Sequence, residues 1–220
     1  MAVSPYDVPG FYDRALETGK HRDIVGGRWD ETGRMQMQIL HDIGVAPDHH
    51  LLDIGAGSLR LGCKAVEHLN PGHYWATDAS RALMLRGRDA ELSDPSRLPP
   101  DHLIEDARFD FPDVPNVITH AICFAVFTHL PLPYLRRALT NLQRFDSLQC
   151  FAFTVFLAPD AQTALHPYRQ PDGVVTHDIR APYHMVAGDV EHVAQQTGWT
   201  LTHDPRRLPR GQVLYQATRV

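Results

Sequence analysis

The sequence predicts an α/β protein built on a mostly parallel sheet with crossover helices. Two observations carry this prediction. Short apolar runs alternate along the 220 residues with segments in which apolar residues recur at helical spacing. One apolar run, residues 51–54, leads directly into a glycine-rich turn, which is typical of a strand–turn–helix unit in a parallel sheet.

The expected elements follow in chain order. A first helix has one apolar face, marked by Met35, Ile39, Leu40 and Ile43, and ends at Gly44. Strands are expected at residues 50–54, 73–77, 102–105, 117–124 and 149–156, and two final strands at 199–203 and 212–217. Helices are expected at 59–69, around 135–142 and at 189–197, and a polar, proline-rich loop precedes the third strand. The last helix has Asp189 as its expected N-cap and Gly198 just after its end.

Composition narrows the class of protein. The net charge is −5 and basic residues form no cluster beyond short pairs, which argues against a nucleic-acid partner. No apolar run reaches the length of a membrane span, and the N-terminus does not resemble a signal peptide, so we expect a cytoplasmic protein. The three cysteines, widely spaced and odd in number, are expected to be reduced thiols, and their spacing matches no zinc motif.

The stretch "LLDIGAGSLRLG", residues 51–62, carries the first functional signal. Gly55 and Gly57 fit a glycine turn that lets the backbone approach a ligand closely. The third glycine of the dinucleotide fingerprint is replaced by Arg60, whose long side chain disfavours a pyrophosphate. Asp53 at the end of the strand suits a ligand that presents an ammonium group instead.

Two further acids follow the next two strands. Asp78 closes the second strand, where an acid accepts hydrogen bonds from both ribose hydroxyls. Asp106 follows the third strand, where an acid can take the exocyclic amine of an adenine. The three positions together suit a ligand that has an ammonium group, a ribose diol and an adenine amine. S-adenosylmethionine (SAM) carries all three groups.

At these residues the chain resembles the class I SAM-dependent methyltransferases, over essentially its whole length. The motifs that match are Asp53–Gly57, Asp78 and Asp106, together with the paired final strands. The resemblance implies a Rossmann-like sheet of seven mostly parallel strands, with helices on both faces and an antiparallel final hairpin. The blocks "GGRWDETGRMQ", "RFDF", "FTHLPL" and "LPRGQVL" also look like a group of small bacterial methyltransferases.

The resemblance implies roles for particular residues. Gly55, Gly57 and Ser58 line the methionine part of SAM, Asp78 and Ala79 lie at the ribose and adenine, and Asp106 and Ala107 lie near the adenine. Either Arg34 or Arg60 can reach the SAM carboxylate, and a surface salt bridge is the alternative for each. Phe124 lies beside the sulfonium, where an aromatic wall gives cation–π contact.

The reacting groups are less well defined. His129 is a candidate general base or, alternatively, part of a structural turn. Tyr12 and Tyr168 are candidates for the wall around a methyl acceptor. Residues 1–46 are expected to form a helical lid or cap on a cofactor-binding domain at 47–220, and residues 166–184 form either a pocket cover or an ordinary surface excursion.

Three functions remain open. The first is methyl transfer from SAM to an oxygen or nitrogen of a small molecule, since SAM's activated methyl group needs mainly alignment with an acceptor. The second is cyclisation of SAM itself to azetidine-2-carboxylate with release of methylthioadenosine, which the apolar Phe124-Ala125 step motivates. The third is a SAM-binding module without turnover. The oligomeric state is left open.

Overall fold

The computed structural model describes residue 6 and residues 10–220. A seven-stranded sheet has the order β10-β11-β5-β4-β1-β2-β3. Its strands are β1 (Leu51–Ile54), β2 (Tyr74–Asp78), β3 (Leu103–Glu105), β4 (His120–Cys123), β5 (Cys150–Val155), β10 (Trp199–Asp204) and β11 (Val213–Arg219). β1 pairs in parallel with β2 and β4, whereas β11 pairs antiparallel with β5 and β10. This topology confirms the fold class predicted from the sequence.

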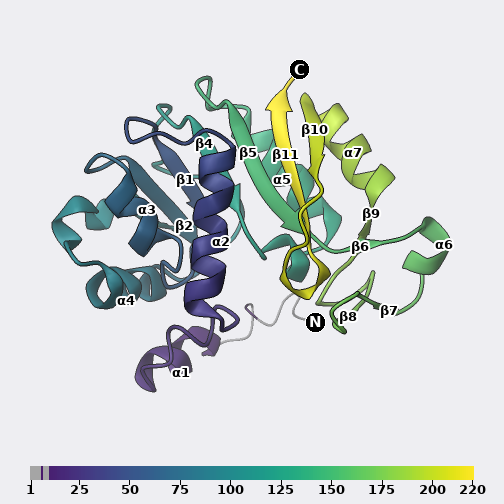
Figure 1. Cartoon of the computed structure of the whole chain (residues 1–220), viewed down its shortest axis with the longest axis horizontal. Helices are drawn as coiled ribbons and strands as arrows, with labels where there is room; N and C mark the ends of the chain where they lie inside the picture. The colour runs from purple at the N-terminus through teal and green to yellow at the C-terminus, as the bar shows by residue number, and fades with distance from the viewer. Residues whose placement is uncertain (1–5, 7–9) are drawn as a thin grey trace. The chain divides into compact units, whose positions relative to one another are not determined.

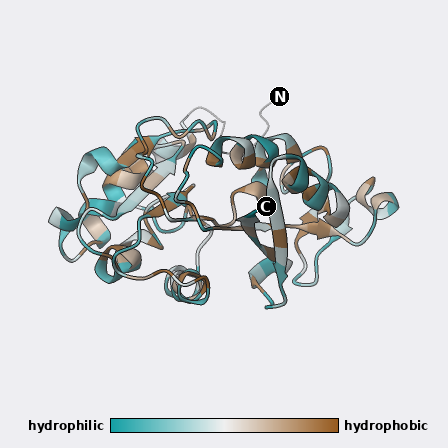
Figure 2. Cartoon of the chain, turned by 90° about the horizontal axis from the view of Figure 1, so that it is seen from above, coloured by the Kyte–Doolittle hydropathy of each residue, from teal (hydrophilic) through white to brown (hydrophobic). Residues whose placement is uncertain are grey.

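The chain forms two compact units. Residues 10–122 and 145–148 form the N-terminal unit, and residue 6, residues 123–144 and residues 149–220 form the C-terminal unit. The helices in both units alternate between brown and teal in Figure 2, as expected for helices that bury one face. No helix in the described part of the chain is long and apolar enough to cross a membrane.

The helices α1 to α4, the strands β1 to β3 and most of β4 belong to the N-terminal unit (Figure 1). The helices are α1 (Phe11–Glu17), α2 (Trp29–Asp42), α3 (Gly62–His68) and α4 (Arg81–Glu91). Every residue of β1 is buried, Asp53 included, because the strand lies inside a parallel sheet that is covered on both faces. Gly44 follows α2 with a φ of +82°, which confirms the predicted end of the first long helix.

The segment that forms the helix α4 was predicted from the sequence to be a loop. Ser80 caps it, since its hydroxyl accepts a hydrogen bond from the backbone of Leu83 at 3.2 Å. Leu83, Met84 and Gly87 form its buried face. Only two of these three side chains are large and apolar, and arginines stand among them, so the apolar periodicity is weak. The helix packs against β2 and β3.

The C-terminal unit contains α5 (Leu132–Leu142), α6 (Ala161–Ala164) and α7 (Ala187–Gln196). An insertion at residues 157–186 adds α6 and the short strands β6 (Leu157–Ala158), β7 (Tyr168–Arg169), β8 (Val175–Thr176) and β9 (Met185–Val186). The helix α7 starts two residues before Asp189, with Val186 as the N-cap, so the predicted N-cap at Asp189 is wrong. Asp189 instead lies in the first turn of the helix, where a carboxylate interacts favourably with the helix dipole. The predicted strand at 117–124 is shorter, spanning only β4.

Candidate functional site

The carboxyl ends of β1, β2 and β3 are joined by backbone hydrogen bonds. The amide of Gly55 donates to the carbonyl of Thr77 at 2.7 Å, and the amide of Asp106 donates to the carbonyl of Asp78 at 2.8 Å. Because the strands are parallel neighbours, the three predicted motifs meet at one edge of the N-terminal unit. This edge is where open α/β sheets bind ligands.

The glycine loop needs its glycines for conformation and for space. Gly55 and Gly57 have φ values of +73° and +57°, in the left-handed region that disfavours side chains. A Cβ at Gly57 would also stand 2.5 Å from Cγ1 of Val25. Both glycines were predicted from the sequence, whereas the contact of Val25 with Gly57 was not.

Asp78 links the glycine loop to β2. Its carboxylate accepts the amide of Gly57 at 2.9 Å through one oxygen and the amide of Ser80 at 3.0 Å through the other. Burial raises the pKa of Asp78 to about 6, and the hydrogen bonds from these backbone amides act in the opposite direction. The side chain therefore orders the loop, and its ionisation lies close to neutral pH.

Asp53 is bound from the neighbouring strand. Its carboxylate accepts the hydroxyl of Tyr74 at 2.6 Å, and both side chains are almost completely buried. Burial is the main cause that raises the pKa of Asp53 to about 7; the hydrogen bond from Tyr74 lowers it. Asp53 and Asp78 are thus two buried acids next to the glycine loop. A positive charge nearby would stabilise the ionised form of each.

Asp106 shapes the loop after β3. One carboxylate oxygen accepts the amide of Arg108 and the other accepts the amide of Phe111, each at 2.8 Å. Phe111 and Phe109 adopt positive φ values and are buried, so the loop folds back on itself. Ala107 is exposed beside Asp106, and Ala79 is likewise exposed at the end of β2.

A segment that precedes α2 lies against the glycine loop. We call residues 21–27 the strap. The hydroxyl of Ser58 donates to the carbonyl of His21 at 2.7 Å. A guanidinium nitrogen of Arg60 donates to the carbonyls of Val25 and Gly27 at 2.8 and 3.3 Å. The strap is therefore fastened to the loop by two residues that the sequence analysis assigned to the cofactor.

Glu91 at the end of α4 holds the beginning of the strap. Its carboxylate binds the ring of His21 at 2.6 Å and the guanidinium of Arg22 through two bonds of 2.7 and 2.5 Å. The hydrogen bond from Arg22 is the main cause that lowers the pKa of Glu91. Neither the strap nor Glu91 was identified from the sequence, because their contact joins residues about 70 positions apart.

The two arginines proposed for the SAM carboxylate differ in their surroundings. Arg60 is buried, and its Nε also donates to Gln36 of α2 at 3.3 Å. Arg34 is exposed on α2. The geometry therefore gives Arg60 a clear role in fixing the strap, and leaves the guanidinium of Arg34 at the surface.

The loop after β4 belongs to the C-terminal unit. Phe124 is buried, and Ala125 adopts a φ of +61°. The amide of Ala125 donates to the hydroxyl of Thr154 at 2.8 Å, and this hydroxyl donates to the side chain of Gln212 at 2.8 Å. Thr128 closes the loop through a hydroxyl bond of 2.9 Å to the carbonyl of Ala125. Thr154 of β5 and Thr128 thus hold a strained turn in place.

His129 lies at the end of this turn. Its ring packs edge-on against the ring of Tyr6, with centroids 5.1 Å apart. Its Nδ1 is buried and has no hydrogen-bond partner among the residues that the structure describes. Burial, reinforced by the cation of Arg210, lowers the pKa of His129 to about 4. At neutral pH His129 is therefore uncharged but a weak proton acceptor.

The two tyrosines proposed for an acceptor wall lie in different units. Tyr12, in α1 of the N-terminal unit, packs edge-on against Phe11 at 5.5 Å. Tyr168, in β7 of the C-terminal unit, has its ring centroid 6.5 Å from that of His184. Over residues 6 and 10–220, no group of three or more His, Cys, Asp or Glu side chains is arranged to hold a metal ion.

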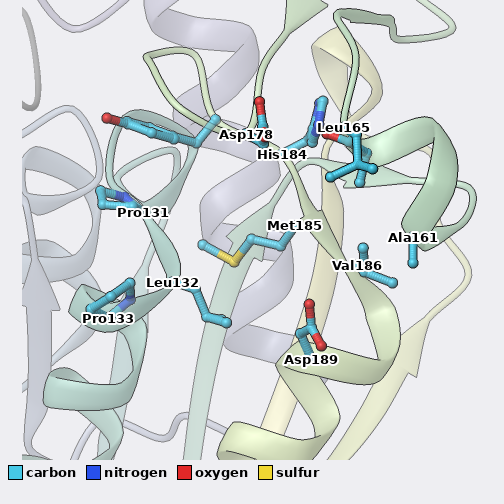
Figure 3. A pocket seen from close by; sticks show the side chains of 12 residues that line it. Pro131, Leu132, Pro133, Ala161, Leu165, Asp178, His184, Met185, Val186 and Asp189 are labelled. Carbon is cyan, nitrogen blue, oxygen red and sulfur yellow. Dashed lines mark hydrogen bonds between the residues drawn. The ribbon is translucent and has the colours of Figure 1, made fainter.

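The C-terminal unit contains a pocket of about 440 Å³ (Figure 3). Its walls come from the start of α5, the insertion and the start of α7. Residues 166–184, expected to form either a cover over the cofactor pocket or a surface excursion, contribute Asp178, Tyr183 and His184 to this separate pocket. Their role as a cover for the cofactor stays a prediction.

Comparisons with known proteins place the fold. No protein-family model and no curated protein sequence matches the chain. Many solved structures do. Magnesium protoporphyrin IX methyltransferase (ChlM) from Synechocystis PCC 6803 with bound SAH has a TM-score of 0.63 at 14% identity, covering 95% of this chain and 97% of that one. The glycopeptide N-methyltransferase MtfA complexed with SAH has a TM-score of 0.58 at 13% identity, covering 84% and 86%.

A third structure, TnmH, has a TM-score of 0.62 at 13% identity and covers 98% of this chain and 62% of that chain. At such low identity the likeness establishes the fold. The chain therefore has the fold of the class I SAM-dependent methyltransferases, as the resemblance in the sequence predicted. A fold of this kind hosts many activities, so the function depends on the residues at its edge.

Proposed function

We propose that the protein transfers a methyl group from SAM to an oxygen or nitrogen of a small molecule. The observation that carries the proposal is the meeting of the glycine loop, Asp78 and Asp106 at the carboxyl edge of β1–β3. Three groups that suit the methionine, ribose and adenine parts of SAM lie on three neighbouring strands, in that order. The likeness in fold to methyltransferases adds support.

The residues at this edge fit SAM in chemistry as well as in order. Gly55 and Gly57 would receive the methionine part, Asp78 the ribose hydroxyls, and Asp106 with Ala107 the adenine. Asp53 and Asp78 are buried acids with raised pKa values, and a nearby cation relieves the cost of their ionisation. When bound, SAM supplies a methyl group that its sulfonium has already activated.

The other residues of the chain favour catalysis by alignment. The strap, with Val25 against Gly57, covers the glycine loop and would keep water from the methionine end. The resemblance in the sequence assigns Phe124 to the sulfonium, and an aromatic ring suits such a cation. Because the pKa of His129 is about 4, we expect it to contribute little as a base. Holding acceptor and methyl in line would then supply most of the rate enhancement.

The strap also refines the proposed lid. Residues 1–46 were expected to cap the cofactor domain, and the contacts of Ser58, Arg60 and Glu91 support this role for residues 21–27. Residues 1–5 and 7–9 of that segment lie outside the described residues. We propose that the strap, rather than the whole segment, is the part that closes the cofactor site.

The first test is calorimetry of SAM binding, followed by mass spectrometry of the protein incubated with SAM. We expect binding, stable SAM in the absence of an acceptor, and S-adenosylhomocysteine when a mixture of small amines and phenols is added. Methylthioadenosine with a four-membered cyclic amino acid from SAM alone would establish the cyclase instead. Binding without turnover under all conditions would indicate a SAM-binding module, and absence of binding would overturn the proposal.

A further inference from the structure

The pocket of the C-terminal unit has the form of a ligand site. Its volume of about 440 Å³ lies in the range of small-molecule sites. Leu132 at the start of α5, Met185 and Val186 in β9, and Ala164 and Leu165 around the end of α6 supply its apolar walls. Figure 3 shows the Met185 side chain extending into the middle of this space.

Leu165 lines the pocket although 69% of its surface is accessible, so part of the apolar wall faces solvent. Burial of this side chain by an apolar ligand would contribute free energy to binding.

The charged groups of the pocket have a single sign. Asp178 and Asp189 line it from the insertion and from α7, and no lysine or arginine is among the lining residues. In the described part of the chain, neither carboxylate forms a hydrogen bond or an ion pair with another side chain. Figure 3 shows them at opposite ends of the space, with Met185 between them. The pocket is therefore apolar in its walls and negative at its ends.

The wall behind the pocket is fixed by hydrogen bonds. One ring nitrogen of His184 binds the carbonyl of Ala164 at 2.9 Å and the other binds the hydroxyl of Thr176 at 2.8 Å. Gln170 donates to the same hydroxyl at 3.0 Å. These side chains are buried, so the insertion is a folded cover with a preformed cavity.

We propose that this pocket binds a small organic amine cation with an apolar body. The aliphatic walls bury the body, and Asp178 and Asp189 attract the ammonium group. A carboxylate or phosphate ligand is disfavoured, because two acids would repel it and no basic side chain lines the site. The proposal concerns binding alone and does not depend on methyl transfer.

The test uses the full-length protein without SAM and three probes of one shape: 2-(1-naphthyl)ethylamine, 2-(1-naphthyl)ethanol and 1-naphthylacetate. Isothermal calorimetry is expected to give a dissociation constant for the amine at least tenfold lower than for the alcohol, and no binding of the carboxylate. The double variant Asp178→Asn/Asp189→Asn is expected to weaken amine binding about tenfold and leave alcohol binding unchanged. Glu191→Gln, also on α7 but outside the pocket, is the matched control and should bind the amine normally.

A second variant keeps the test independent of the acids. Ala161→Trp places a large ring at an exposed position on the pocket wall, where it should fold normally and block the amine. Circular dichroism and the melting temperature establish that each variant is folded. Equal binding of amine and alcohol, or undiminished amine binding in the folded Asn/Asn or Trp variant, would overturn the proposal. Loss of SAM binding would affect the proposed function alone, because this experiment contains no SAM.

Discussion

Gly87 of α4 rests on the backbone of Ser58 in the glycine loop. A Cβ at Gly87 would overlap the Ser58 carbonyl oxygen, and that oxygen belongs to rigid backbone rather than to a flexible side chain. The backbones of the helix and the loop are therefore in direct contact, with no room for a side chain at position 87. Because Ser58 also holds the strap, this contact connects α4 to both parts of the candidate site.

Gly87→Ala is expected to displace the glycine loop. Overpacking typically costs about 1–3 kcal/mol, which exceeds the gain of about 1 kcal/mol from the better helix propensity of alanine. We therefore expect a lower free energy of unfolding and SAM binding weakened at least fivefold. Urea denaturation and calorimetry with SAM measure the two effects.

The matched control is Gly188→Ala. Gly188 also lies in a helix, α7, but nothing stands within 4 Å of the position its Cβ would take. This substitution should leave the protein unchanged or stabilise it by about 0.5–1 kcal/mol. If both variants lose stability equally, the contact with Ser58 is not the cause.

Glu91→Gln is expected to loosen the strap. The variant removes the charge that pairs with Arg22 and His21, while the amide keeps the size of the side chain. We expect faster amide hydrogen exchange in residues 21–27 and faster dissociation of SAM, by about threefold or more, because the strap loses its contact with α4. Exchange mass spectrometry and stopped-flow displacement give both rates.

Asp89→Asn controls for the loss of a charge on the same helix. Asp89 is exposed, and the ion pair that it forms is with its neighbour Arg88. Exchange in the strap should not change in this variant. Slow exchange in the strap of Glu91→Gln, matching the wild type, would show that Ser58 and Arg60 hold the strap without Glu91.

The affinity for SAM is expected to fall as the solution is acidified from pH 8 to pH 5.5. Asp53 and Asp78 have pKa values of about 7 and 6, so both become protonated over this range and lose their attraction for the positive charges of SAM. S-adenosylhomocysteine keeps the ammonium but lacks the sulfonium, so its affinity should fall less. Calorimetry with both ligands across the range measures the difference. Parallel curves for the two ligands would exclude the buried acids as a source of selectivity.

The sequence was sufficient to predict the fold class and the order of the three motifs at the edge of the sheet. Strong signals produced these results: the buried strands are rich in apolar residues, and Gly55 and Gly57 have a backbone requirement that few other residues meet. The helix α4 was missed because its buried face has only Leu83 and Met84 as large apolar side chains. Helix propensity and apolar periodicity are local signals, and both are weak in the segment that forms α4.

The strap could not be predicted from the sequence for a different reason. Its position depends on contacts with Glu91, Ser58 and Arg60, which are far away in the sequence, and no spacing rule predicts such pairs. Asp53 illustrates the same limit. Its position at the strand end predicts a ligand contact, but only the structure shows that the hydroxyl of Tyr74 binds its carboxylate.

A row of histidines at the amino ends of the parallel strands leads to the last prediction. The rings of His50 and His73 are stacked with centroids 3.9 Å apart, and the ring of His49 lies 4.7 Å from that of His120. Burial, followed by the charge of His49, lowers the pKa of His120 to about 4. Burial is also the first cause that lowers the pKa of His50. His120 and His50 are therefore protonated less readily in the native protein than in the unfolded chain.

Stability should consequently fall as the pH drops from about 6.5 towards 4. The unfolded chain binds protons at these histidines in this window and the native protein does not, so acid favours unfolding. Asp53 and Asp78 act in the opposite sense, because their raised pKa values make the native state bind protons over the same range. The histidines with lowered pKa values outnumber these two acids, so we expect the net effect to be a loss of stability.

His120→Gln isolates one member of the row. Unfolding of the variant should take up at most one proton fewer than unfolding of the wild type. The slope of the unfolding free energy against pH should then fall by no more than about 1.4 kcal/mol per pH unit. Urea denaturation at intervals between pH 7.5 and pH 4.5 gives this slope. His192→Gln, at an exposed position of α7, should retain the wild-type slope. An unchanged slope in His120→Gln would mean that His120 is protonated equally in both states, and that the acid sensitivity arises elsewhere in the fold.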